Sequence, residues 1–313
     1  MFRPLFTLLL VLAAALGLRA EAQSFGPLVT PAELAMRQDE IKPTLLDIRG
    51  EGYDKSHIPG AISAPYGLFR GPANNPGAVP AADQLQATYR SLGLELSTPI
   101  VVVSEGNDDT DFGAAARVYW TLKSSGFTTL SVLNGGQIAW EAAGFPTDNT
   151  VVTPAPSDVS ISFSDRWLAD TAEVERLSQE RGQALLVDAR PEGFFNGQQQ
   201  HTAAARPGTL PGAVSLPYTD FFAQGRATVN PQADAGAIRQ ALGLQPGQTE
   251  EIVSFCNTGH WAATNWFVMS ELAGLPDVKL YPGSMVEYSQ TGQPMDHTPG
   301  LFQNALRQLG GGK

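Results

Sequence analysis

Short apolar runs alternate with amphipathic stretches along most of the chain. Three of the runs lie at 45–48, 100–103 and 130–133, and the stretches near 32–37 and 114–123 have helical spacing. Strands that alternate with helices favour a parallel sheet with helices on both of its faces. We therefore predict an α/β fold, in which ligands bind at the carboxyl ends of the strands.

The order of these segments occurs twice in the chain. Four segments of the first half return in the second half: Leu45–Arg49 as Leu186–Arg190, His57–Ile62 as Thr209–Val214, Ile100–Val103 as Ile252–Phe255, and Gly135–Trp140 as Gly283–Tyr288. The spacing is about one domain length, so duplication of a single domain is the simplest account. We predict tandem domains over 23–148 and 163–300.

Three further segments lie outside these domains. Residues 149–162 are rich in Pro, Thr and Ser, which predicts a linker. Arg3, the apolar stretch 4–18 and Ala20–Ala22 have the order of a signal peptide, which we place at 1–22, and residues 301–313 form a C-terminal tail. The apolar stretch is shorter than the roughly 20 residues that span a bilayer. A periplasmic or secreted protein is therefore predicted, without a membrane anchor after cleavage.

Composition limits the possible function classes. The chain has 313 residues, of which 42% are hydrophobic and 16% charged, enough for two buried cores. Its 31 acidic residues exceed its 20 basic residues, and the net charge is −11. Because an acidic surface repels phosphate backbones and anionic lipids, nucleic-acid and membrane-surface partners are not expected.

The single cysteine, Cys256, follows the apolar run Ile252–Phe255 and precedes a short polar loop, 257–261. A helical pattern follows at once and Gly274 is its natural end. Backbone N–H groups in such a loop and at the start of a helix favour a thiolate, which is the nucleophilic form. The alternative is a small core residue. Because an unpaired thiol is a liability in an oxidising compartment, the predicted export favours a chemical role for Cys256 over a structural one.

Other uses of this cysteine fit the sequence less well. A cysteine phosphatase needs an arginine that closes the loop, and Ala262 stands there. A zinc site on Cys256 and His260 lacks two further ligands, because the other histidines are scattered along the chain. A serine hydrolase needs a Gly-x-Ser-x-Gly segment, which is absent. No metal and no cofactor is predicted.

Four motifs, each present in both halves, carry a family resemblance. They are the Asp-x-Arg after a buried strand, the Pro-Gly-Ala turn, the strand-loop-helix around Cys256 and the closing glycine segment. Together they resemble the two-domain rhodaneses, which are sulfurtransferases, over nearly the whole chain from Leu28 to Tyr288. The resemblance implies a catalytic second domain and a non-catalytic first domain, in which Glu105 occupies the place that matches Cys256.

The resemblance also implies a mechanism and a set of site residues. Cys256 takes a sulfane sulfur from a small donor, thiosulfate or a mercaptopyruvate-like compound, and passes it to a thiol, cyanide or a protein. The donor-binding candidates are Asn257, Thr258, Gly259, His260, Trp261 and Arg190. Each side chain has an alternative role: Asn257 and Thr258 as ordinary loop formers, His260 in solvent, Trp261 against the core, and Arg190 as a partner of Asp188.

The chain departs from the family at the positions that select the donor. Loops for thiosulfate carry basic residues directly after the cysteine, and loops for 3-mercaptopyruvate carry a small residue and a serine; here Asn257 and Thr258 stand there. Phe194 and Asn196 replace the arginines of the mercaptopyruvate enzymes. Arg190 and Arg206 are the nearest remaining cations in the sequence. The alternative to an enzyme is a periplasmic persulfide carrier or sulfur-relay binding protein.

Overall fold

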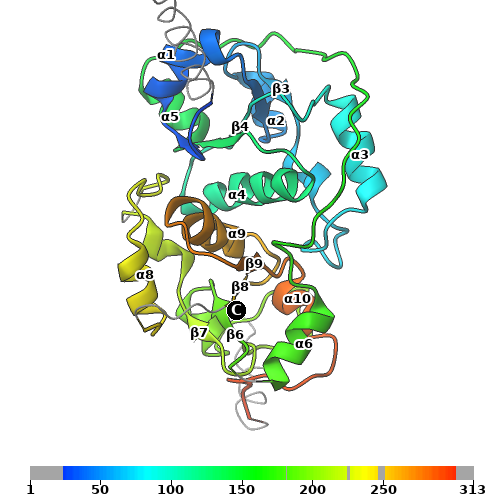
Figure 1. The fold of residues 1–313 in the computed structure, drawn as a ribbon, viewed down its shortest axis with the longest axis vertical. Helices are drawn as coiled ribbons and strands as arrows, with labels where there is room; N and C mark the ends of the chain where they lie inside the picture. The colour runs from blue at the N-terminus through cyan, green and yellow to red at the C-terminus, as the bar shows by residue number, and fades with distance from the viewer. Residues whose placement is uncertain (1–23, 181, 224–225, 246–250, 301–313) are drawn as a thin grey trace, which may run out of the picture.

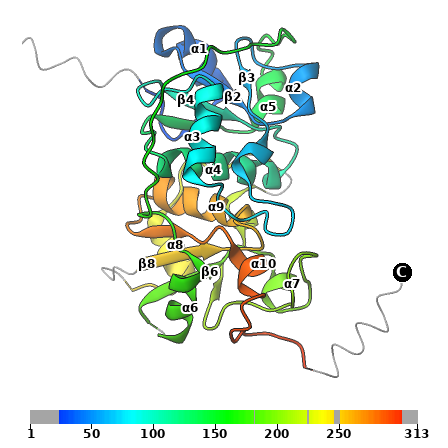
Figure 2. The ribbon, with the colours of Figure 1, turned by 90° about the vertical axis from the view of Figure 1, so that its right-hand side faces the viewer.

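The computed structural model describes residues 24–180, 182–223, 226–245 and 251–300. Figures 1 and 2 show two α/β domains stacked along the long axis of the molecule. The predicted signal peptide and the predicted C-terminal tail lie outside the described residues. Among the helices that are described, none has the length and apolar character needed to cross a membrane.

The first domain is built on a five-stranded parallel sheet. Its strand order is β1-β5-β4-β2-β3, from β1 (Leu28–Val29), β2 (Thr44–Asp47), β3 (Ile62–Ser63), β4 (Ile100–Val103) and β5 (Leu130–Leu133). Its helices are α1 (Pro31–Ile41), α2 (Glu51–Lys55), η1 (Tyr66–Phe69), α3 (Ala82–Ser91), α4 (Asp109–Ser124) and α5 (Gly136–Ala142).

The second domain repeats this plan with a four-stranded parallel sheet. Its strand order is β7-β6-β8-β9, from β6 (Ala184–Asp188), β7 (Val214–Ser215), β8 (Glu251–Phe255) and β9 (Val278–Leu280). Its helices are α6 (Thr171–Gln179), α7 (Glu192–Phe195), η2 (Tyr218–Phe221), α8 (Ala235–Ala241), α9 (Trp261–Phe267), η3 (Val268–Leu272) and α10 (Ser284–Tyr288). The predicted fold class, two tandem α/β domains with parallel sheets, is confirmed.

Helix α4 starts earlier than the apolar pattern predicted. The side chain of Asp108 accepts hydrogen bonds from the N–H groups of Thr110 and Asp111, which satisfies two donors of the first turn. The first turn is polar, so it carries no hydrophobic periodicity that would reveal it in the sequence. The cap therefore extends the helix by more than one turn toward the second domain.

The two domains meet through α4 and α9. Both views place these helices side by side between the two sheets (Figures 1 and 2). Aromatic rings fill the contact: Phe112 of α4 meets Phe267 of α9 edge-on, with ring centroids 5.4 Å apart. One continuous hydrophobic cluster runs from the first sheet through both helices to the second sheet. This shared core holds the first domain against the segment that follows β8 in the second domain.

Candidate active site

Cys256 is the first residue after β8, at the carboxyl end of a strand that lies between β6 and β9. Its exposed fraction is only 1%. The N–H groups of Cys256 and Gly259 both donate to Ser284 Oγ, at 3.0 and 3.2 Å, and this hydroxyl donates to the carbonyl of Tyr281 at 2.7 Å. Ser284 has a φ of 52°, a left-handed conformation that is unusual for serine. The serine hydroxyl thus ties both ends of the loop together.

The loop 257–260 follows the thiol directly and has one residue in the left-handed conformation. Gly259 has a φ of 64°, and a Cβ at this position would lie 2.6 Å from Nη1 of Arg117. Glycine is therefore required there on both steric and conformational grounds. In the described part of the chain, the N–H groups of Asn257, Thr258 and His260 donate to no protein acceptor. These three N–H groups are therefore available to an anion that binds at the loop.

Arg190 lies beneath the loop in a buried ion pair. Its Nε is 2.9 Å from Oδ1 of Asp188 and its Nη2 is 2.6 Å from Oδ2, while Thr209 donates to the same carboxylate at 2.7 Å. Nη1 of Arg190 donates to Oδ1 of Asn257 at 3.3 Å. Arg190 thus holds the first residue of the loop, and its charge is matched by Asp188. Arg206 donates instead to the backbone carbonyls of residues 289 and 293.

The first domain also reaches the loop, which the sequence did not reveal. Arg70 donates to the carbonyl of Thr258 at 2.9 Å. Arg117 of α4 donates to the carbonyl of Gly259 at 3.4 Å and to that of Gly77 at 2.8 Å. The signal that could have revealed Arg117 is its position, since it is a cation flanked by the apolar residues Ala116 and Val118. The cations absent from the loop are supplied by the other domain.

His260 bridges the two domains. Its Nε2 lies 2.8 Å from the carbonyl of Thr110, which only accepts, so the ring proton is on Nε2 and Nδ1 accepts from the Tyr66 hydroxyl at 3.0 Å. A Cβ at Gly113 would lie 2.9 Å from Cδ2 of His260, so α4 packs closely on the ring. Desolvation, assisted by the charge of Arg70, lowers the pKa of His260 to about 4. His260 is therefore a neutral contact between the domains.

This environment predicts a pH dependence of stability. The unfolded chain takes up a proton at His260 near the ordinary value of 6.5, whereas the native protein does so only near pH 4. His260 therefore lowers the free energy of unfolding as pH falls from about 6.5 to about 4, and has no such effect above 6.5. Glutamine can make both hydrogen bonds without titrating. We expect His260→Gln to lose less thermal stability than wild type between pH 7.5 and 4.5; equal losses would contradict this.

Trp261 begins α9 and forms an aromatic wall beside the loop. Its ring stacks on Tyr218, with centroids 5.0 Å apart and planes 5° apart, and meets Phe194 edge-on at 6.0 Å. Its Nε1 lies 3.4 Å from Oγ1 of Thr110 in the first domain. Trp261 thus packs against neighbouring rings and remains partly exposed.

The match of Glu105 to Cys256 is wrong. In the first sheet Asp47 pairs with Val103, and in the second sheet Asp188 pairs with Phe255. Ser104 and Cys256, the residues that follow these two pairs, are therefore equivalent to each other. Arg49 of the first domain contacts Glu105 at 3.5 Å, just as Arg190 contacts Asn257.

The first domain therefore carries a serine where the second carries the thiol. A serine hydroxyl cannot form a persulfide either, so the first domain still has no nucleophile for this chemistry. Gly136 stands where the second domain has Ser284, because the N–H of the next residue donates to the carbonyl of Ser104 in the first domain and to that of Cys256 in the second. The first domain lacks both the thiol and the hydroxyl that ties the loop.

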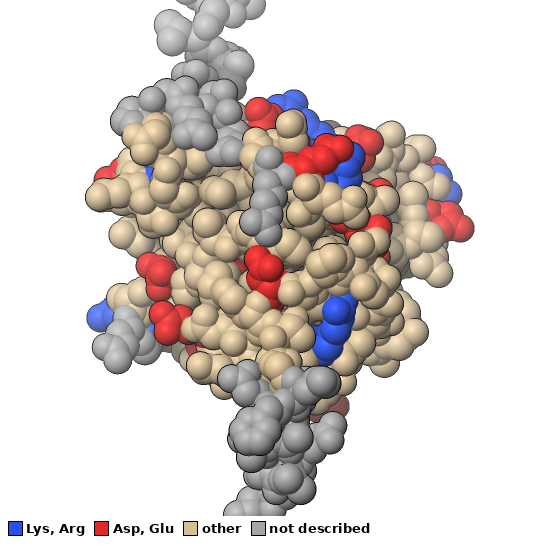
Figure 3. Space-filling model, turned by 90° about the horizontal axis from the view of Figure 1, so that it is seen from below, with Lys and Arg blue, Asp and Glu red and all other residues tan. Residues whose placement is uncertain are grey.

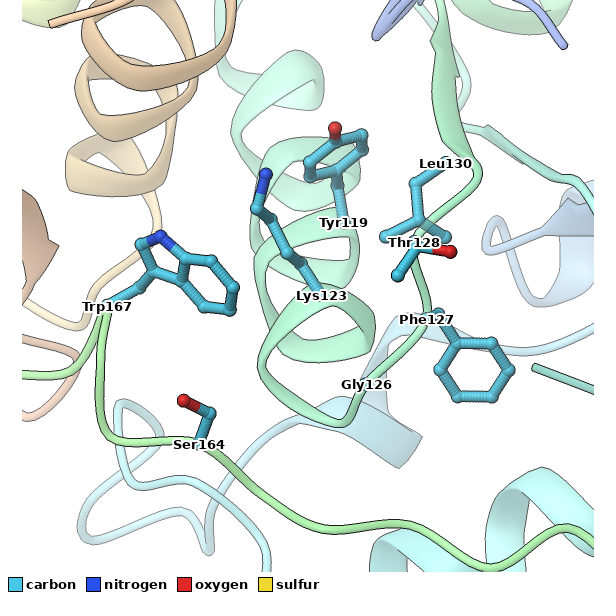
Figure 4. Close-up of a pocket in the computed structure, with 8 residues that line it drawn as sticks. All are labelled: Tyr119, Lys123, Gly126, Phe127, Thr128, Leu130, Ser164 and Trp167. Atoms are coloured by element: carbon cyan, nitrogen blue, oxygen red, sulfur yellow. The ribbon is translucent and has the colours of Figure 1, made fainter. Parts of the chain in front are cut away.

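A separate cavity lies between the domains, away from Cys256. Its volume is about 350 Å³, and Figure 4 shows its lining residues, Tyr119, Lys123, Gly126, Phe127, Thr128, Leu130, Ser164 and Trp167. The amine of Lys123 lies 2.7 Å from Oε2 of Glu271 and 5.1 Å from the ring centre of Trp167. The cavity is at the C-terminal end of α4, whereas the loop contacts Thr110 and Arg117, which lie nearer the start of the helix. No group of three or more candidate metal ligands occurs within the described residues.

Comparisons with known proteins follow the same two-domain division. The model of the rhodanese-like domain matches residues 30–143 and, again, residues 170–291. Among solved structures, the 3-mercaptopyruvate sulfotransferase SseA of Escherichia coli superposes with a TM-score of 0.71 at 23% identity, over 83% of this chain and 99% of that chain. This second likeness concerns the fold.

Curated relatives extend along nearly the same length. The "Putative thiosulfate sulfurtransferase" of Synechococcus elongatus is 28% identical over 291 residues, which cover 90% of this chain and 88% of that protein. Human 3-mercaptopyruvate sulfurtransferase is 26% identical over 262 residues, covering 80% and 82%. The sulfur carrier protein TtuD of Thermus thermophilus is 26% identical over 246 residues, covering 75% and 83%.

Proposed function

Since the chain belongs to the rhodanese family, we propose that it is a sulfurtransferase that moves a sulfane sulfur from a small anionic donor to a thiophilic acceptor through a persulfide on Cys256. The observation that carries this proposal is the placement of the only cysteine at the carboxyl end of β8, inside a loop with unpaired N–H groups. Thiosulfate is the first donor to test, because the Synechococcus relative is named for it.

The proposed reaction has two displacements at sulfur. The Cys256 thiolate attacks the outer sulfur of thiosulfate. A bond forms between the Cys256 sulfur and this outer sulfur, the sulfur–sulfur bond of thiosulfate breaks, and sulfite leaves with the electron pair. Cys256 then carries a persulfide anion. Cyanide or an acceptor thiolate then attacks the outer persulfide sulfur, and the sulfur–sulfur bond on Cys256 breaks. Thiocyanate or a new persulfide leaves, and Cys256 is again a thiolate.

Intact-mass spectrometry tests this proposal directly. The purified protein is exposed to thiosulfate and, in a separate sample, to 3-mercaptopyruvate. We expect the mass to rise by one sulfur atom with a competent donor and to return to its starting value after cyanide is added. No mass increase with either donor would reject the proposed function.

Arg70 is the residue best placed to receive the charge of the donor. It is partly exposed, contacts the carbonyl of Thr258 and has no carboxylate partner among the ion pairs of the described residues. Because a charge-assisted hydrogen bond is worth about 1.5–3 kcal/mol, Arg70→Gln should raise the KM for thiosulfate about ten- to a hundredfold. Steady-state kinetics with cyanide measure this. An unchanged KM would exclude Arg70 from donor binding.

A persulfide carrier is the second candidate, because TtuD is named as a sulfur carrier. The burial of Cys256 favours small partners, since a protein thiol would have to enter between the domains. Seen from below, most of the surface belongs to uncharged side chains, and acidic and basic side chains lie intermixed near its upper edge (Figure 3). A catalyst should show ping-pong kinetics with a small donor, whereas a carrier should load only from a partner protein.

The proposed location is the periplasm or the extracellular space, supported by the signal-peptide pattern of residues 1–22. Export would remove this segment and leave Gln23 as the first residue. N-terminal sequencing of the protein from its native cells tests this. A mature chain that retains Met1 would overturn the proposed location.

A further inference from the structure

Arg117 is a fully buried cation between the two domains. Its exposed fraction is 0%, and its guanidinium contacts the backbone carbonyls of Gly259 and Gly77 and the ring of Trp120, 5.2 Å away. Its Nε has no hydrogen-bond partner among the residues that the structure describes. Among the ion pairs of the described residues, none includes Arg117. A buried charge is costly unless an opposite charge lies near it, so a counter-charge is expected.

The loop that begins at Cys256 is in direct contact with Arg117. Arg117 lies against Gly259, and the N–H groups of Gly259 and Cys256 share one acceptor, Ser284 Oγ. Burial lowers the pKa of Arg117 to about 9, so the side chain remains a cation at neutral pH. The charge of Arg70 lowers this pKa further, whereas negative charge on Tyr66 or on Cys256 raises it.

We infer that Arg117 is the counter-ion of the Cys256 thiolate, and that it keeps this role for the persulfide anion on which the proposed function rests. Burial disfavours a thiolate because the charge leaves water, and a cation beneath the loop offsets that cost. The first domain then has an electrostatic part in the chemistry. It supplies through α4 the charge that Asn257 and Thr258 do not provide.

The other charged and titratable groups around the loop do not take this place. Arg190 is paired with Asp188, and His260 is neutral above about pH 4. Burial raises the pKa of Tyr66, so its hydroxyl keeps its proton. Arg70 is partly exposed and lies on the Thr258 side of the loop. Asp108, at the start of α4, adds a negative charge near His260.

The pH dependence of Cys256 alkylation by iodoacetamide tests the inference without any sulfur donor. In Arg117→Met the midpoint should move to higher pH by about one to three units, the effect of losing an adjacent opposite charge, and alkylation at pH 7 should slow about tenfold or more. Arg117→Lys keeps a charge and should shift less. The matched control is Lys123→Met, which removes a cation from the same helix and an ion pair of 2.7 Å with Glu271.

The control variant Lys123→Met should lose stability but keep the wild-type pH midpoint of Cys256 alkylation. An unchanged midpoint in Arg117→Met would overturn the inference, whether or not the protein transfers sulfur. If Arg117→Met does not fold, the thermal stabilities of wild type and Cys256→Ser are compared between about pH 6 and pH 9. If the thiolate is stabilised in the native state, the stability of the wild type rises relative to that of Cys256→Ser as pH increases. If the difference in thermal stability between wild type and Cys256→Ser does not increase over this pH range, the inference is overturned.

Discussion

Cys256→Ser should abolish sulfur loading from every donor, so that no mass increase appears and sulfur transfer to cyanide falls to the rate without protein. The reason is chemical: a serine hydroxyl at neutral pH is not a nucleophile for sulfane sulfur and cannot hold a persulfide. The fold should persist. The substitution removes little volume and leaves the backbone bond to Ser284 in place.

The first domain offers a matched control for this variant. Ser104 is the equivalent residue, also buried at the carboxyl end of a central strand. Ser104→Ala should leave both sulfur loading and turnover unchanged. Sulfur transfer that survives in Cys256→Ser, or a loss of transfer in Ser104→Ala, would show that the chemistry is not confined to the second domain.

The strands were the most predictable part of the fold. Ile100–Val103 and Leu130–Leu133 have the bounds that the apolar runs indicated, because both strands are buried on both faces and read as continuous hydrophobic segments. The start of α4 was missed because a polar cap determines it. The equivalence of Glu105 was misjudged because the register of β4 against β2 fixes that position, and hydrophobic pattern does not.

The second domain's part of the site could be predicted from local sequence, and the first domain's part could not. Cys256 and its loop are continuous in the chain, so a strand followed by a helical pattern reveals them. Arg117 reaches the loop because α4 packs against α9, and Arg70, which follows η1, contacts the loop directly; both contacts join residues more than a hundred positions apart in sequence. A helical pattern shows that a face is buried but does not name its partner.

Arg190→Met is expected to destabilise the protein by about 3–5 kcal/mol, since it leaves the buried carboxylate of Asp188 without its cation. Among the described residues, Thr209 and one backbone N–H would be the remaining donors to that carboxylate. The loop would also lose the contact with Asn257. Urea unfolding measures the change. Asp188→Asn combined with Arg190→Met removes both charges and should recover part of the loss.

The control for this prediction is an ion pair on the surface. Arg176 and Glu180 lie 2.9 Å apart with side chains 50% and 57% exposed, so Arg176→Met should cost less than ~1 kcal/mol. The same pair of variants decides between the two roles considered for Arg190. A structural role predicts a large loss of stability with a KM for thiosulfate close to wild type in the protein that remains folded. If Arg190→Met is instead as stable as Arg176→Met and its KM rises, Arg190 binds the donor and its pairing with Asp188 is secondary.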